Sequence, residues 1–71
     1  MKISYDPETD SLYIDLLART STESEEVSPG FVIDYDSEGC VVGIEIDHAS
    51  RRLDLHELTL SKIPVEQQPQ R

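Results

Sequence analysis

The chain has 71 residues and carries 15 Asp and Glu against 6 Lys and Arg, which gives a formal net charge of -9 at pH 7. A surface dense in carboxylates repels phosphate backbones, so the composition argues against direct binding of nucleic acid. The one cysteine, Cys40, has no partner for an intramolecular disulfide and excludes a zinc site built on several cysteines. A chain this short forms one domain with a thin core.

Residues 1–16 predict a β-hairpin. Apolar residues alternate with polar ones on both sides of the acidic segment Asp6–Asp10, and this period of two is typical of strands with one buried face. Pro7 fixes its own φ and cannot donate to a strand ladder, which places it in the turn. Residues 19–26 then break the alternation with Ser, Thr and Glu, and we expect a surface loop there.

Residues 31–46 predict a second hairpin around a turn that ends in Gly39. The alternation of both hairpins places Ile14, Ile33, Ile44 and Ile46 on one buried face, opposite Asp15, Asp34 and Glu45. We therefore expect a four-stranded antiparallel sheet of two β-hairpins, in a meander-like order, with one solvated face and one face that needs a cover.

The cover has to come from the residues after His48. Short helical segments are expected between Ala49 and Leu58, because Asp54 and Glu57 have the spacing of a capping box. An extended piece over residues 60–65 is the alternative, since the leucines of this region fit neither a helix nor a strand. The predicted fold is thus α+β, with a single globular domain over 1–63, helical segments on one sheet face and a flexible tail over 64–71.

Two segments resemble a known family. Residues 2–8 with 10–14, and residues 32–36 with 39–50, are similar to the two halves of the bacterial Domain of Unknown Function 2283 family. The resemblance covers residues 1–53 and implies a small cytoplasmic prokaryotic domain without catalytic residues to carry over. Genes of this family are sometimes found beside genes for small toxin-like proteins. The resemblance therefore also implies an antitoxin-like arrangement.

Three groups of residues have the chemistry of a site. Residues 34–45 approach the spacing of a calcium loop, but their flanks are strand-like and Val42 occupies a ligand position, so a plain turn is favoured. His48 and His56, with the nearby Asp47, Asp54 and Glu57, are candidates for a metal-dependent regulator or a small enzyme. Cys40 lies in acidic surroundings that do not activate a thiol.

The leading hypothesis is a non-enzymatic protein-interaction module without metal or cofactor, acting as the acidic antitoxin-like partner of a small basic protein. The alternatives are the histidine-based enzyme or metal-dependent regulator and a structural homodimer. We also expect a homodimer, because a small sheet has two unpaired edges, and we expect outward apolar residues, Tyr13, Val32 and Val41, to form the contact surface. The absence of a long apolar run predicts a cytoplasmic protein that does not enter a membrane.

Overall fold

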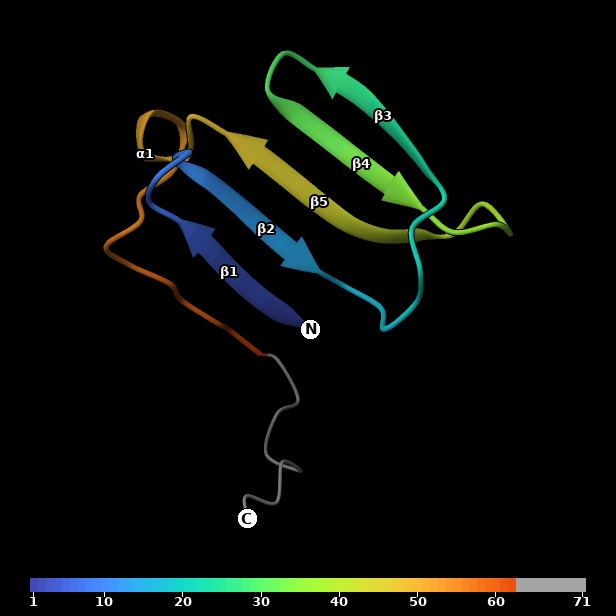
Figure 1. Ribbon diagram of the computed structural model, residues 1–71. Helices are drawn as coiled ribbons and strands as arrows, with labels where there is room; N and C mark the ends of the chain where they lie inside the picture. Colours follow the sequence, from blue (N-terminus) through green and yellow to red (C-terminus); the bar gives the residue numbers. More distant parts are fainter. Residues whose placement is uncertain (63–71) are drawn as a thin grey trace.

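The structure is a computed structural model that describes residues 1–62. It consists of one antiparallel sheet and one short helix (Figure 1). The elements in chain order are β1 (Lys2–Asp6), β2 (Ser11–Asp15), β3 (Glu23–Ser28), β4 (Phe31–Tyr35), β5 (Val41–Asp47) and α1 (Ala49–Arg52). The predicted antiparallel sheet and short helix are confirmed, but the number and order of the strands differ.

The sheet has five strands in the order β1-β2-β5-β4-β3. The predicted hairpins are β1–β2 and β4–β5, and β5 lies between β2 and β4. After β2 the chain therefore passes the ends of two strands before it reaches the opposite edge as β3 (Figure 1). A meander-like order was wrong, because the two hairpins join through their second strands, β2 and β5.

The fifth strand, β3, lies where a surface loop was expected. Its residues, Glu23–Ser28, are all exposed, so no burial pattern marks them as a strand. Backbone pairing with β4 holds the strand, with a register irregularity between Glu26 and Ser28. The turn into β4 uses Pro29 and Gly30, and Gly30 has a φ of +83°, where a side chain is disfavoured.

The apolar face of the sheet follows the predicted alternation. Ile14, Ile44 and Ile33 lie directly opposite one another on β2, β5 and β4, and Leu12, Ile46 and Phe31 form the neighbouring row. Burial is less complete than predicted. Val42, Ile46 and Ala49 are the buried apolar residues, whereas Ile14, Ile33 and Ile44 are half-buried. These isoleucines stay half-buried because α1, with four residues, is too small to form a second layer over the apolar face of the sheet.

The capping-box residues form a turn and do not begin a helix. The carboxylate of Asp54 accepts a hydrogen bond from the amide of His56 (3.1 Å), and residues 53–62 contain no helix or strand. Helical segments between Ala49 and Leu58 are thus reduced to α1, at the end of the sheet where β2 begins (Figure 1). Arg52 of α1 stacks over Phe31, 5.2 Å from the ring centre.

Within the described residues, no helix is long and apolar enough to cross a membrane. The tail predicted over 64–71, and the part of the extended piece that follows Lys62, lie outside the described residues.

Candidate interaction surface

A groove opens on the apolar face between the first hairpin and the segment after α1. It has a volume of about 360 Å³. Its lining consists of side chains from β1, β2 and residues 54–58, namely Ile3, Leu12, Ile14, Asp54, Leu55, His56, Glu57 and Leu58. Ile3 is 43% exposed and Leu58 69% exposed. The groove is therefore a partly open apolar hollow between the sheet and a segment without regular secondary structure.

Carboxylates flank the apolar face on both sides. Asp54 and Glu57 belong to the groove lining beside the first hairpin. On the opposite edge, Glu25 of β3 pairs with Ile33 and Glu23 pairs with Tyr35, so these glutamates extend the apolar rows of β4. The apolar face therefore has an apolar centre with acidic margins.

The opposite face is polar and is built around a tyrosine that bridges two strands. The Tyr13 hydroxyl of β2 donates a hydrogen bond to Asp34 of β4 (2.8 Å). The ring passes over Gly43 of β5, where an added Cβ would lie 1.9 Å from the hydroxyl oxygen. Asp34 also accepts a hydrogen bond from Ser24 of β3 (2.6 Å). This chain of contacts connects β2, β4 and β3 on the polar face.

Burial and neighbouring acids change two pKa values on this face. Burial, the hydrogen bond to Asp34 and the charge of that carboxylate raise the pKa of Tyr13 to about 12. Burial raises the pKa of Glu45 as well, and the nearby Asp47 raises it further. A hollow of about 450 Å³ lies beside these residues, with Tyr5 and Tyr13 in its lining, and neither histidine is among its described lining residues.

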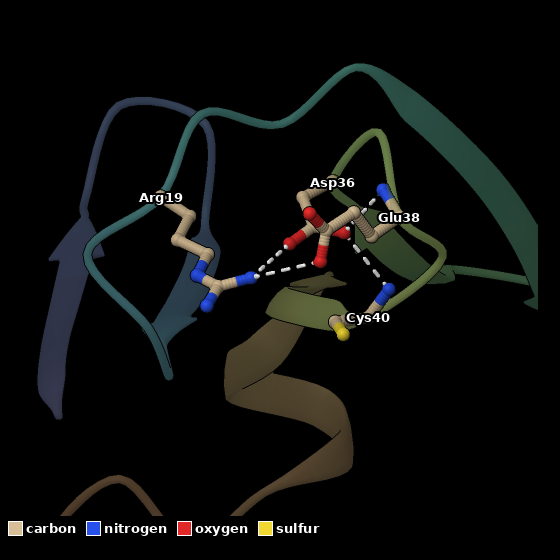
Figure 2. A network of polar contacts seen from close by, with 4 residues as sticks. All are labelled: Arg19, Asp36, Glu38 and Cys40. Carbon is tan, nitrogen blue, oxygen red and sulfur yellow. Dashed lines mark hydrogen bonds and ion pairs between the residues drawn. The ribbon is translucent and has the colours of Figure 1, made fainter.

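Figure 2 shows a second polar network, at the turn between β4 and β5. Asp36 is buried and accepts hydrogen bonds from the Arg19 guanidinium (2.9 Å) and from the amides of Glu38 and Cys40 (2.9 Å each). The bond from Arg19, followed by the amide of Cys40, lowers the pKa of the Asp36 carboxyl group. Because Arg19 belongs to the segment between β2 and β3, this ion pair connects that segment to the turn between β4 and β5.

Asp10 plays the corresponding role at the other end of the sheet. Its carboxylate accepts hydrogen bonds from the Tyr5 hydroxyl (2.7 Å) and from the Ser50 hydroxyl (2.8 Å), and its carbonyl accepts one from the amide of Ala49 (2.9 Å). The hydrogen bond from Tyr5 is the main cause of the lowered pKa of Asp10. These contacts attach α1 to the turn between β1 and β2.

The residues predicted as a contact surface lie apart from the groove. Tyr13 and Val32 share the polar face, on either side of Glu45. The hydroxyl of Tyr13 is engaged with Asp34, and Val41, 37% exposed, begins β5 opposite Tyr35. Their role as an interaction surface stays a prediction.

The histidines and the cysteine are separated in the fold. His48 is exposed and precedes α1 with a φ of 54°, whereas His56 belongs to the groove lining. Cys40 is exposed beside the Asp36 network. Over residues 1–62 no group of three or more His, Cys, Asp or Glu side chains has the arrangement of a metal site. In the segment that resembled a calcium loop, Asp34 faces Tyr13 and Ser24, whereas Asp36 faces Arg19.

Sequence reasoning missed the groove. The sequence contained one signal of it: the leucines at positions 55, 58 and 60 fit no regular period. In the structure these leucines are 37%, 69% and 54% exposed. Exposed apolar residues that follow no period indicate a segment whose conformation tertiary contacts decide.

A comparison with known families places the chain in a class of proteins whose family description assigns no function. Residues 2–50 match the family described as "Protein of unknown function (DUF2283)", and the chain belongs to that family. Neither the curated proteins nor the solved structures compared with the chain give a match.

Proposed function

We propose that the protein is a non-enzymatic interaction module and the acidic partner of a small basic protein. The observation that carries this proposal is the apolar groove of about 360 Å³ with Asp54 and Glu57 in its lining. A groove with apolar walls and charged margins is suited to binding one anchoring side chain and selecting its neighbours by charge.

The exposed apolar residues support a surface that a partner covers, because leaving them in contact with water is unfavourable. Ile3 of β1 is 43% exposed, and Leu55 and Leu58 add further apolar area beside it in the groove lining. Contiguous apolar patches of this kind mark interaction sites in proteins of this size. A Leu, Phe or Met side chain of the partner fits the groove, because these residues bury the most apolar area per contact.

The charge selects the kind of partner. The chain has a net charge of -9, and carboxylates lie on both margins of the apolar face. Lys or Arg residues beside the anchor gain from this field, whereas acidic partners are repelled. A small basic protein that the module neutralises, as an antitoxin neutralises its toxin, has the matching chemistry.

The test uses two synthetic peptides with identical leucine spacing, one flanked by lysines and the other by glutamates. Titration into isotope-labelled protein, followed by nuclear magnetic resonance, should give shifts at Ile3, Ile14 and Leu55 with the lysine peptide only. Binding should weaken as salt rises.

A pair of matched variants separates the groove from the overall charge. Asp54→Asn with Glu57→Gln removes two carboxylates from the groove lining and should weaken binding of the lysine peptide by about tenfold. Glu8→Gln with Glu38→Gln removes the same charge from two exposed turns and should change it by less than about twofold. Equal losses in the two variants, or shifts confined to the polar face, would refute the groove as the binding site.

The antitoxin-like role is tested by co-expression. A small basic protein encoded by a neighbouring gene should be toxic when expressed alone and should lose its toxicity when it is expressed together with this chain.

A further inference from the structure

The outer edge of β1 is unpaired within residues 1–62. β1 forms one edge of the sheet, its five residues are exposed, and β2 is its backbone partner. The other backbone hydrogen bonds of the described residues do not involve β1. Every second residue of such a strand directs its N–H and C=O away from the sheet, where they can receive another strand.

The sequence of β1 is complementary to itself. When two copies of Lys2–Asp6 run antiparallel about a two-fold axis at Ser4, Lys2 lies opposite Asp6 of the second copy. In the same register, Ile3 lies opposite Tyr5, and Ser4 lies opposite Ser4. Opposite charges and pairs of aromatic with β-branched residues are the favourable cross-strand combinations. The faces also match, since Lys2 and Asp6 share the polar side and Ile3 and Tyr5 the apolar side.

We propose that β1 pairs antiparallel with β1 of a second copy, about a two-fold axis at Ser4, to form a continuous ten-stranded sheet. This homodimer uses a strand edge, and not the face of Tyr13, Val32 and Val41. It also joins the apolar faces of the two copies, because the Ile3 row of one continues into the Tyr5 row of the other.

The opposite edge cannot pair in this way. β3 contains Glu23, Glu25 and Glu26, and every two-fold register about its central residues sets at least two of these glutamates against each other. Like charges directly opposite destabilise a strand pair. The register irregularity between Glu26 and Ser28 adds a further obstacle. Of the two edges, β1 is thus the one suited to pairing with its own copy about a two-fold axis.

In Figure 1 the segment after α1 runs beside β1, and within residues 1–62 it forms no backbone hydrogen bond with that strand. Its residues 54–58 line the groove together with Ile3, Leu12 and Ile14, on the apolar face of the first hairpin. Dimerisation through β1 goes beyond the proposed function, because it uses the backbone edge of β1, although Ile3 belongs both to this strand and to the groove lining. Asp6 does not belong to the groove lining, so a change at Asp6 tests the dimer without altering the groove. Loss of one leaves the other measurable.

A cross-linking experiment tests the register without changing a charge. In adjacent antiparallel strands, directly opposite Cα atoms are about 4.5–5.5 Å apart, within the range that a disulfide bridges. Ser4→Cys in a Cys40→Ser background should therefore give a covalent dimer under mild oxidation. The control is Ser24→Cys in the same background, since Ser24 is an exposed serine on the other edge strand. Equal cross-linking at both positions, or none at Ser4→Cys, would overturn the proposal.

Sedimentation equilibrium supplies the second measurement. Asp6→Lys and Glu25→Lys both change the net charge from -9 to -7 and reduce repulsion between copies equally. Asp6→Lys should nevertheless raise the dimer dissociation constant about tenfold, because it sets Lys2 against a lysine, whereas Glu25→Lys should not raise it. Adding Lys2→Glu to Asp6→Lys restores opposite charges and should recover the dimer, with circular dichroism reporting that each variant is folded. A single species near 8.0 kDa for the unaltered chain excludes the dimer.

Discussion

Within residues 1–62, β1 and β3 are both edge strands that pair on one side only, yet they present different side chains. β1 carries Ile3 and Tyr5 on the apolar face, and Ile3 lines the groove with the exposed Leu55 and Leu58. β3 presents glutamates on both faces and contacts the rest of the sheet through polar groups, including Ser24 bonded to Asp34 and Glu26 bonded to the amide of Gly30 (3.1 Å).

The difference teaches that an edge strand can be specified in two ways. A strand such as β1 is specified by the alternation of its apolar side chains, and its outer backbone N–H and C=O groups can still pair with another strand. A strand such as β3 is specified by backbone hydrogen bonds to its neighbour, while its charges exclude further strands. The glutamates of β3 oppose pairing with a further strand at that edge, whereas the apolar residues of β1 favour contact with another surface at the opposite edge.

Removal of Ile44 should have the largest effect, because Ile44 lies between the two halves of the sheet, opposite both Ile14 and Ile33. Ile44→Ala should lower the free energy of unfolding by about 2–3 kcal/mol, the lower part of the usual range, since the side chain is half-buried. A denaturant titration measures this change, with Ile44→Val as the control at about 1 kcal/mol. A loss under about 0.5 kcal/mol would contradict the register of the apolar rows.

Gly43→Ala should break the polar bridge between the halves. The added Cβ cannot coexist with the Tyr13 hydroxyl, so Tyr13 has to leave Asp34. We expect a loss of about 1–3 kcal/mol in the free energy of unfolding. Replacing Tyr13 by a smaller residue as well should recover part of it in a double-mutant cycle. Additive effects of the two changes would show that the bridge is not the cause.

Asp36→Asn should loosen the segment that leads to β3 in a pH-dependent manner. The pKa of Asp36 is lower in the folded state than its ordinary value, so its ionised form stabilises the fold above about pH 4 and loses this effect as the pH falls through the folded-state pKa. The difference in melting temperature between the two proteins should be greatest near pH 7 and should narrow below about pH 4. Glu8→Gln, at an exposed turn, should show no comparable trend. A constant difference across this range would contradict the role of the ion pair.

Glu45→Gln should have a smaller effect of the opposite sign. Because burial and Asp47 raise the pKa of Glu45, its ionised form is disfavoured in the folded state, and the stability it contributes at low pH is lost as the pH rises through the folded-state pKa. The variant should therefore be more stable at pH 7, by less than about 1 kcal/mol, and this gain should vanish below about pH 4. Thermal unfolding across the pH range measures it, and destabilisation at pH 7 would contradict the assignment.

Calcium should have the smallest effect. The carboxylates of Asp34 and Asp36 accept hydrogen bonds from different protein groups and do not converge on one position. Millimolar calcium should therefore leave the melting temperature unchanged beyond an equal effect of magnesium at the same ionic strength. A saturable rise with calcium alone that Asp36→Asn abolishes would demonstrate a calcium site.

The sequence by itself determined the two hairpins and the shared face of Ile14, Ile33, Ile44 and Ile46. Alternation with period two records burial directly, and Pro7 and Gly39 have local conformational preferences that place the turns. The family resemblance was likewise carried by these alternating segments, and residues 2–50 confirm it.

The tertiary structure alone decided the position of β3, the insertion of β5 between β2 and β4, and the groove. β3 buries none of its residues, so its pairing leaves no periodic signal, and strand order depends on contacts between residues far apart in the chain. The groove forms where residues 54–58, which follow no regular period, face the first hairpin across a hollow. Local patterns record which side of a strand is buried, whereas the identity of a strand's neighbours is a long-range property.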